Sequence, residues 1–165
     1  MKRIETSRLC LRSLAADDRD ALYAIYADPE VSRYLLTQPR SIEEFGPPFQ
    51  KMVELSSTLG MWAIINKADE RIIGRCGFYP YSELETPELA YLLSRAHWGA
   101  GLATEAARGC LAYALSERRW PEVVAMVRPE NRASARVLAK VGMRWARTIQ
   151  VRGNTMDLYN VRSRG

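Results

Sequence analysis

The sequence predicts one mixed α/β domain over residues 1–165, and three observations predict it. Short apolar or alternating runs, typical of strands, are interspersed with segments whose apolar residues recur every three or four positions, typical of helices. A glycine-containing loop at residues 98–101 joins an apolar strand to a long helix. The length of 165 residues suits a single domain with one substantial core.

The expected elements follow the order β-α-α-β-β-β-α-β-α-β-β. Strands are assigned to short segments rich in apolar and β-branched residues, and helices to segments with one apolar face. The expected strands cover residues 9–14, 61–65, 71–78, 88–94, 122–127, 143–151 and 155–161. The expected helices cover residues 17–27, 41–59, 102–118 and 131–141, and a loop covers residues 80–86.

Polar residues and a proline mark the ends of the first two helices. Asp17 is placed to cap the first helix, and Asp28-Pro29 should end it, because a residue before proline avoids the helical conformation. Ser41 and Glu44 have the spacing of a capping box, which predicts the start of the second helix.

Glycines mark two later boundaries. Gly142 is placed to end the helix that begins at Asn131, since a left-handed glycine commonly follows a helix. The tripeptide Arg152-Gly153-Asn154 predicts a tight turn between the last two strands.

The composition favours a globular protein of the cytoplasm. Hydrophobic residues make up 47% of the chain and charged residues 26%, a balance typical of soluble domains. No apolar run approaches the roughly 20 residues that cross a bilayer, and the N-terminus lacks the apolar stretch of a signal peptide. We therefore expect a cytoplasmic protein without a membrane partner.

The cysteines and the net charge limit the kinds of ligand. Cys10, Cys76 and Cys110 are too far apart for a metal motif or a disulfide framework, so we expect buried free thiols and no metal. The net charge of +5 suits an anionic ligand such as a phosphorylated cofactor. Lys and Arg are scattered rather than clustered, which argues against nucleic acid as a partner.

The segment from Glu88 to Ala106 is the most informative part of the chain. It predicts a strand, then the loop Trp98-Gly99-Ala100-Gly101, then a helix. Small residues let main-chain N–H groups face open space, and the first amides of a helix lack partners and lie at its positive end. The loop can therefore cradle a phosphate, or it can be a tight turn with no ligand.

Asn131 and Ser134 form a second candidate pair. They are three residues apart and share one face of the first turn of the expected helix. They can face a ligand, or Asn131 can simply cap the helix with support from Ser134.

Taken together, these segments resemble the GNAT N-acetyltransferase superfamily, and more closely its RimJ/RimL-like branch. The resemblance spans nearly the whole chain, and the joint order and spacing of its pieces carry it. The matching pieces are Glu5–Arg12, Asp28–Val31, Ile72–Gly74, Trp98–Ala106, Asn131-x-x-Ser134 and Lys140–Met143.

The resemblance implies a central, mostly antiparallel twisted sheet with one splayed parallel pair of strands, flanked by helices. It also implies a site for acetyl-coenzyme A in the gap between those strands. Leu92, Leu93 and Ser94 would line the pantetheine arm, and Asn131 would hydrogen-bond it. The implied pyrophosphate ligands are the main-chain amides of Gly99, Ala100, Gly101, Leu102, Ala103 and Thr104. Further residues expected along the cofactor are Ser134, Val137 and Lys140.

The implied reaction is direct acetyl transfer to an amine, without a metal or a covalent enzyme intermediate. Glu88 is the candidate base, acting directly or through a water, and the alternative is a solvated carboxylate at a strand end. A main-chain N–H near Leu92 would polarise the thioester carbonyl. Ser134 is the candidate for orienting or protonating the departing sulfur.

Two positions depart from the wider superfamily. Leu138 stands where many members carry a tyrosine that acts as general acid, although an apolar residue is common in the RimJ/RimL-like branch. Trp98 precedes the glycines and is expected to pack beneath the loop. His97 adjoins the cradle and can touch phosphate or serve as an ordinary loop residue.

The leading hypothesis is therefore an acetyl-coenzyme A-dependent N-acetyltransferase. The acceptor is a protein N-terminal amine, as the branch suggests, or a small amine, an amino acid or an antibiotic. The alternatives are an acetyl-coenzyme A-binding sensor without catalysis, and a nucleic-acid-binding protein suggested by charge alone. A homodimer is common in this branch.

Overall fold

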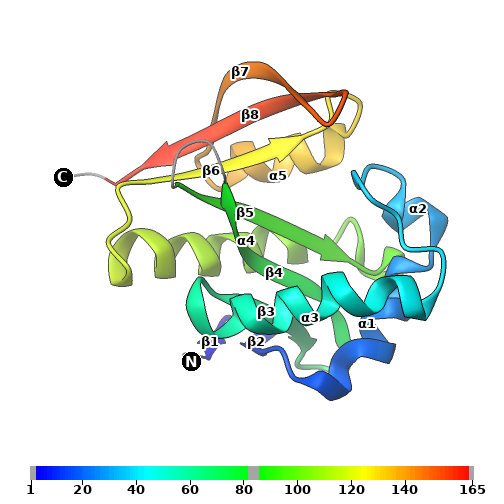
Figure 1. The fold of residues 1–165 in the computed structure, drawn as a ribbon. Coiled ribbons are helices and arrows are strands. Elements are labelled where there is room, and N and C mark those ends of the chain that lie inside the picture. The colour runs from blue at the N-terminus through cyan, green and yellow to red at the C-terminus, as the bar shows by residue number, and fades with distance from the viewer. Residues whose placement is uncertain (1–2, 82–85, 164–165) are drawn as a thin grey trace.

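The computed structural model describes residues 3–81 and 86–163. These residues form one mixed sheet of eight strands with helices on both faces (Figure 1). The strand order is β1-β2-β3-β4-β5-β6-β8-β7, and β5 and β6 are its parallel pair. The expected fold class is confirmed.

The elements alternate along the chain largely as the sequence predicts. The strands are β1 (Ile4–Glu5), β2 (Leu9–Ser13), β3 (Met61–Asn66), β4 (Ile72–Tyr81), β5 (Thr86–Leu93), β6 (Glu122–Val127), β7 (Arg144–Val151) and β8 (Asn154–Arg162). The helices are α1 (Arg19–Tyr26), α2 (Pro29–Ser32), α3 (Ile42–Thr58), α4 (Leu102–Ala112) and α5 (Arg132–Lys140). Two 3-10 turns cover Ala16–Asp18 and Arg95–His97.

Each face of the sheet has its own core. On one face, residues of α4 and α5 such as Cys110 and Leu138 pack against Trp62 and other strand residues. On the opposite face, α1 and α3 bring Leu22 and Phe45 against residues that include Leu92. Successive residues of β5 therefore point alternately toward α4–α5 and toward α1–α3.

The N-terminal part differs from the prediction in its short elements. β1 is a strand of two residues and was not predicted. Asp28 ends α1 as expected, but its carboxylate also accepts the N–H of Glu30 at 3.0 Å and so caps α2, which was not predicted. Asp17 does not cap α1. Instead, Asp18 accepts the N–H of Ala15 at 2.8 Å and pairs with Arg12.

Helix α3 begins as its capping residue predicts. The Ser41 hydroxyl accepts the N–H of Glu44 at 3.2 Å, and the helix ends at Thr58, before Gly60. The helix continues through Pro47-Pro48, because burial of its apolar face against the sheet outweighs the missing N–H groups.

The expected helix over residues 102–118 is not uniform. Helix α4 ends at Ala112, and Tyr113–Glu117 form a π-helical turn in which the N–H of Arg118 donates to the Tyr113 carbonyl at 2.9 Å. The expected loop over residues 80–86 is shorter than predicted, since β4 reaches Tyr81 and β5 begins at Thr86. Residues 82–85 lie outside the described part of the chain.

Two turns agree with the sequence prediction. Gly142 adopts a left-handed conformation with φ +89° directly after α5, as a helix-ending glycine should. Arg152 and Gly153 both have positive φ and join β7 to β8 in a tight hairpin. None of the helices in the described segments is both long enough and apolar enough to cross a membrane.

The feature of the fold that positions the site is the contact between β5 and β6. The register joins these strands at a single pair, Glu88 and Val124. By contrast, β4 and β5 are paired from Gly74–Leu93 to Tyr81–Thr86. Beyond Glu88, β5 and β6 diverge, and the main chain of β5 that faces β6 is left without a strand partner.

We predict that Gly74→Ala lowers the free energy of unfolding by about 2 kcal/mol or more. A Cβ at Gly74 would lie 2.0 Å from the Leu92 carbonyl oxygen, so β4 and β5 would have to separate. The control is Gly109→Ala in α4, where a Cβ would meet only the ends of the Ile4 and Thr6 side chains, at 3.1 and 3.5 Å. Urea unfolding should show a much smaller loss of stability, or a gain, for the control. Equal stabilities for the two variants would contradict this packing.

Candidate active site

The glycine loop before α4 forms an open cradle. Gly99 and Gly101 have φ of +76° and +78°, a region that other residues rarely adopt. A Cβ at Gly99 would meet nothing within 4 Å, and one at Gly101 would meet only Nη2 of Arg8, at 3.6 Å. Gly101 is the N-cap of α4, so the amides that follow it lie at the positive end of the helix.

The side chains of the cradle do not obstruct it. Leu102 and Thr104 are buried against the core, while Gly99, Ala100 and Gly101 are exposed. All six expected pyrophosphate ligands therefore lie in one turn whose open side is main chain. This geometry fits an anionic group held by N–H donors.

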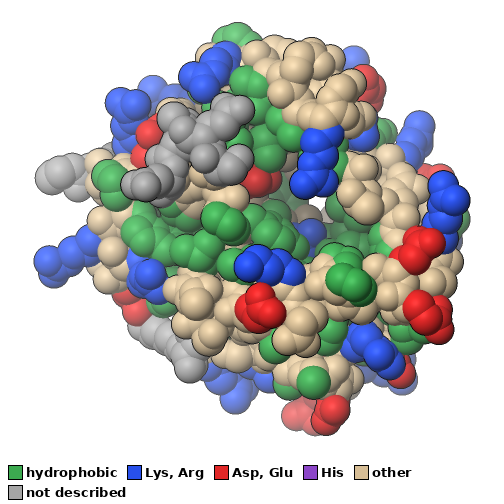
Figure 2. Space-filling model, in the orientation of Figure 1, with side chains coloured by type: hydrophobic (Ala, Val, Ile, Leu, Met, Phe, Trp, Pro, Cys, Tyr) green, Lys and Arg blue, Asp and Glu red, His purple; other side chains and the backbone are tan. Residues whose placement is uncertain are grey.

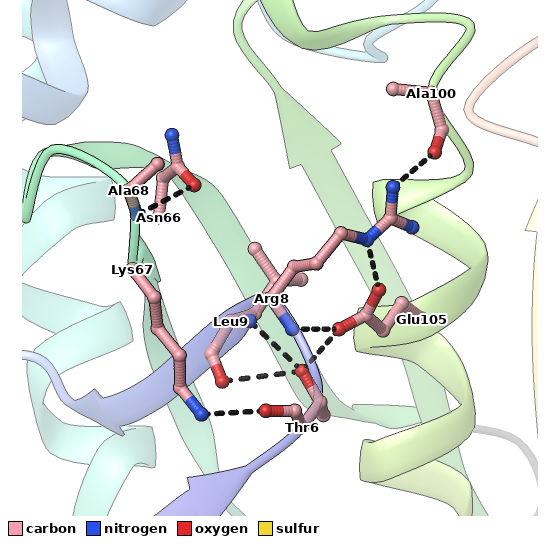
Figure 3. Close-up of polar contacts among 8 residues, drawn as sticks. All are labelled: Thr6, Arg8, Leu9, Asn66, Lys67, Ala68, Ala100 and Glu105. Carbon is pink, nitrogen blue, oxygen red and sulfur yellow. Dashed lines mark hydrogen bonds and ion pairs between the residues drawn. The ribbon is translucent and has the colours of Figure 1, made fainter.

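A salt bridge that the sequence analysis missed supports this loop (Figure 3). The Nε of Arg8 donates to a carboxylate oxygen of Glu105 at 2.8 Å, and the Arg8 main-chain N–H donates to the other at 2.7 Å. The Nη1 of Arg8 donates to the Ala100 carbonyl at 2.8 Å. Lys67 donates to the Thr6 carbonyl at 2.6 Å, which fixes the β1–β2 turn beside the loop.

The salt bridge has an electrostatic consequence for the cradle. Burial alone would raise the pKa of Glu105, but hydrogen bonds from Thr6 and Arg8 outweigh it and lower this pKa. Glu105 is therefore a carboxylate in the first turn of α4, where it would repel a bound phosphate. Arg8 neutralises this charge and keeps its Nη2 beside Gly101.

The end of β5 presents main chain to the gap. The Ser94 N–H donates to the Ile73 carbonyl of β4 at 2.8 Å, and the Leu92 carbonyl faces Gly74. Because main-chain groups alternate along a strand, the N–H and C=O groups of Leu93 face the gap. The side chains of Leu92 and Leu93 are buried, and the Leu92 carbonyl faces β4, so of these two residues only Leu93 presents main chain to a ligand in the gap.

The residues after β5 differ in part from the prediction. Trp98 was expected to pack beneath the loop, but it is 50% exposed, and its indole N–H donates to the Leu93 carbonyl at 2.9 Å. The Nδ1 of His97 is hydrogen-bonded to the Ser94 hydroxyl at 2.7 Å. This bond links His97 to the end of β5, so His97 helps to hold the turn that follows the strand.

Across the gap, the start of α5 carries the second candidate pair. The Asn131 side chain accepts the N–H of Ser134 at 3.2 Å, so Asn131 caps the helix. Tyr91 of β5, which the sequence analysis did not single out, reaches across to bond the Ser134 hydroxyl at 2.8 Å and its carbonyl at 3.0 Å. Burial raises the pKa of Tyr91, and the bond with Ser134 offsets part of this rise.

The rest of α5 lies along the same side. Val137 packs against the core, and Lys140 is exposed. Leu138, at the position where the wider superfamily often has tyrosine, is 1% exposed and belongs to the core. The hydroxyl groups described at this helix are therefore that of Ser134, one turn before Leu138, and that of Tyr91 on β5.

Glu88 lies on the opposite face of β5 from Tyr91. Burial raises the pKa of Glu88 to about 7, although the charge of Arg75 acts in the other direction. A carboxylate with this pKa can take up a proton near neutral pH. Within the described part of the chain, Glu88 has no hydrogen-bond or ion-pair partner.

The two expected catalytic residues thus face opposite sides of the sheet and meet only through the gap between β5 and β6. In the view of Figure 2, a hollow opens at this place, with basic side chains at its floor and rim and an acidic side chain on its wall.

Two arginines hold the α2 segment nearby. Arg95 pairs with Asp28 at 3.1 Å, and Arg128 donates to the Tyr34 carbonyl at 3.1 Å.

The three cysteines are free and buried, as expected. Cys76 pairs with Tyr91 across β4 and β5, and its sulfur atom lies 3.3 Å from that of Cys110. Over residues 3–81 and 86–163, no cluster of three His, Cys, Asp or Glu side chains could hold a metal ion.

Comparison of the sequence with known proteins identifies relatives of this chain. Residues 8–144 match the model of the acetyltransferase (GNAT) domain. The chain is 32% identical over 166 residues to the uncharacterized protein YkkB of Bacillus subtilis (strain 168), covering 98% of this chain and 96% of YkkB.

Solved structures share the fold. An acetyltransferase from Agrobacterium tumefaciens aligns with a TM-score of 0.86 at 25% identity, covering 99% of this chain and 95% of that one. The ribosomal L7/L12 alpha-N-protein acetyltransferase RimL, solved in complex with coenzyme A, aligns with a TM-score of 0.83 at 16% identity, covering 98% of each chain.

We predict that Glu88→Gln raises the melting temperature at pH 8 but not at pH 4.5. The folded state holds the Glu88 proton up to about pH 7, whereas an unfolded glutamate releases it near its ordinary pKa. The wild-type protein therefore loses stability as pH rises between these values, and the neutral amide does not. Melting curves that differ equally at both pH values would show that Glu88 is not buried in this way.

Proposed function

Because the chain belongs to the GNAT acetyltransferase family, we propose that it transfers the acetyl group of acetyl-coenzyme A to a primary amine. The observation that carries the proposal is the gap between β5 and β6, closed at Glu88 and open toward the glycine cradle. A linear cofactor with a diphosphate at one end and a thioester at the other fits this combination. Residues 1–165 would form the single domain that carries this activity.

The cofactor would be held largely by main chain. The amides of residues 99–104 would bind the diphosphate, and the edge of β5 that faces the gap would pair with the pantetheine amides as an added strand does. The Leu93 carbonyl on this edge would accept a second hydrogen bond beside that from Trp98. The Asn131 amide and the Val137 and Lys140 side chains would lie beside it on α5. RimL, which shares the fold, is seen with coenzyme A.

The transfer needs a neutral amine and an escape for the sulfur. The amine nitrogen forms a bond to the acetyl carbonyl carbon, the carbon–sulfur bond breaks, and the coenzyme leaves as a thiolate. Glu88 takes the proton that the amine loses, which its pKa of about 7 allows. A main-chain N–H near Leu92, which the alternation assigns to Leu93, would donate to the carbonyl oxygen as negative charge develops.

The proton for the sulfur would come from α5. Ser134 is the hydroxyl residue of α5, and its side chain faces β5. The hydrogen bond of 2.8 Å with the Tyr91 hydroxyl holds it there. Tyr91 is protonated at neutral pH, as a tyrosine ordinarily is, and burial raises its pKa further. The pair can thus pass a proton to the thiolate and replace the tyrosine that Leu138 displaces.

The raised pKa of Glu88 favours a catalyst over an acetyl-coenzyme A sensor, because a sensor gains nothing from a buried carboxylate beside its ligand. The acceptor in the RimJ/RimL-like branch would be a protein N-terminus, and small amines are the other class. Coenzyme release measured with diverse amines and N-terminal peptides separates these options. Tight cofactor binding without any release would instead identify a sensor.

We predict that Gly101→Trp abolishes acetyl-coenzyme A binding, because the indole would fill the cradle. The matched control is Gly153→Trp in the β7–β8 hairpin, which carries the same backbone strain at φ +75°. Isothermal titration calorimetry should show wild-type affinity for the control. Unchanged affinity in folded Gly101→Trp would place the diphosphate elsewhere.

We also predict that kcat/KM of the wild-type enzyme rises tenfold per pH unit up to about pH 7 and then levels off. Only the deprotonated Glu88 can accept the proton of the amine. Glu88→Gln should not show this rise with pH, and its kcat should be at least about 100-fold lower than that of the wild type. Its affinity for the cofactor should stay within about twofold of the wild-type value. Wild-type rates in Glu88→Gln across this range would remove Glu88 as the base.

A further inference from the structure

Arg75 is a buried arginine that neither the fold nor the proposed reaction accounts for. It lies on β4, opposite Leu92 of β5, and is 5% exposed. Its Nε donates to the Tyr26 hydroxyl at 2.8 Å. Its guanidinium carbon lies 5.9 Å from the centre of the Tyr26 ring and 5.5 Å from that of Tyr79.

No ion pair with a described carboxylate offsets the charge of Arg75, and its effect on the pKa of Glu88 acts without a direct bond. Among residues 3–81 and 86–163, no carboxylate forms an ion pair with it, and no acceptor lies within reach of its Nη1. Arg12, by contrast, pairs with Asp18 at 2.7 Å. A buried charged donor without a partner is costly, so buried arginines are normally paired.

The surroundings of Arg75 belong to the candidate active site. Tyr79 pairs with Glu88 across β4 and β5, and Arg75 pairs with Leu92 two pairs further along, on the same face of the sheet. The pair between them is Gly77 with Ala90. The main chain of Gly60 and Met61 packs against Gly77, while the small side chain of Ala90 is only partly buried. The hollow seen in Figure 2 has basic side chains at its floor and rim, and an acidic one on its wall.

We propose that Arg75 binds a carboxylate of the acceptor, so that the acceptor is a free amino acid or a similar small molecule with an amine and a carboxylate. This inference rests on the proposed function. The guanidinium offers two parallel N–H groups to a planar carboxylate, while the amine of the same molecule faces Glu88. A protein N-terminus carries a peptide amide in place of that carboxylate, so it would leave Arg75 unpaired.

Binding requires a small movement of the protein. The Nη1 of Arg75 is covered in the absence of ligand. Of the two aromatic neighbours, Tyr26 is buried and Tyr79 reaches the surface. The Tyr79 ring is therefore the one that moves to admit the carboxylate, and its hydroxyl then stays close to the bound group.

The test compares free amino acids with their carboxamides as acceptors. Release of coenzyme A is measured at pH 8.5, where Glu88 is deprotonated, for the wild type, Arg75→Met and the control Arg71→Met, which replaces an exposed arginine. The amides have the more acidic ammonium group, so a preference for acids cannot come from the supply of free amine. We expect at least one amino acid to exceed its amide tenfold or more in kcat/KM with the wild type and Arg71→Met. In Arg75→Met the two should be equal within about twofold.

A second readout does not require turnover. Methionine replaces an unpaired buried charge with an apolar chain, so Arg75→Met should fold and melt at a higher temperature than the wild type. In the presence of coenzyme A, the preferred amino acid should raise the melting temperature of the wild type and not that of Arg75→Met.

The outcomes separate the two proposals. If amides react as fast as acids and Arg75→Met keeps the wild-type pattern, the carboxylate site is wrong, while acetyl transfer stands. If peptides with free N-termini react and amino acids do not, the acceptor is a protein and the inference is also overturned. If no amine of any kind releases coenzyme A, the proposed function fails, and the inference fails with it.

Discussion

The divergence of two parallel strands determines what this protein can bind. Because β5 and β6 share one residue pair, the main chain of β5 beyond Glu88 has hydrogen-bonding groups that no strand satisfies. The gap also connects two faces of the sheet that would otherwise be separate. Glu88 on the α1–α3 face and Ser134 in the first turn of α5 can act on one ligand only if that ligand passes through this opening.

Electrostatic arrangement follows from the same geometry. The cradle at the start of α4 attracts anions because its donors are main-chain amides at a helix N-terminus, and Arg8 prevents Glu105 from cancelling this effect. On the other face, burial raises the pKa of Glu88 to about 7. Arg75 lies on the same face, and its Nη1 has no hydrogen-bond acceptor among the described residues. The diphosphate, the amine and a carboxylate can thus be recognised at three separate places.

Much of the fold could be predicted because local signals agreed with the tertiary structure. Ser41 and Glu44 marked the start of α3, and Arg152-Gly153 marked the last hairpin. The cradle was also visible, since its glycines lie between a strand and a helix. The role of Asn131 as a cap was one of two alternatives, and the geometry confirms the cap while its contact with a cofactor stays a prediction.

Other features could not be predicted, because they depend on residues far apart in the chain. Arg8 and Glu105 meet only after β2 and α4 pack together. The Tyr91–Ser134 bond and the isolation of Arg75 likewise depend on how strands and helices assemble. The most direct test of the central claim is a crystal structure of the protein with acetyl-coenzyme A. The account predicts the diphosphate on the amides of residues 99–104 and the thioester between β5 and β6. A cofactor bound elsewhere, with the gap empty, would contradict it.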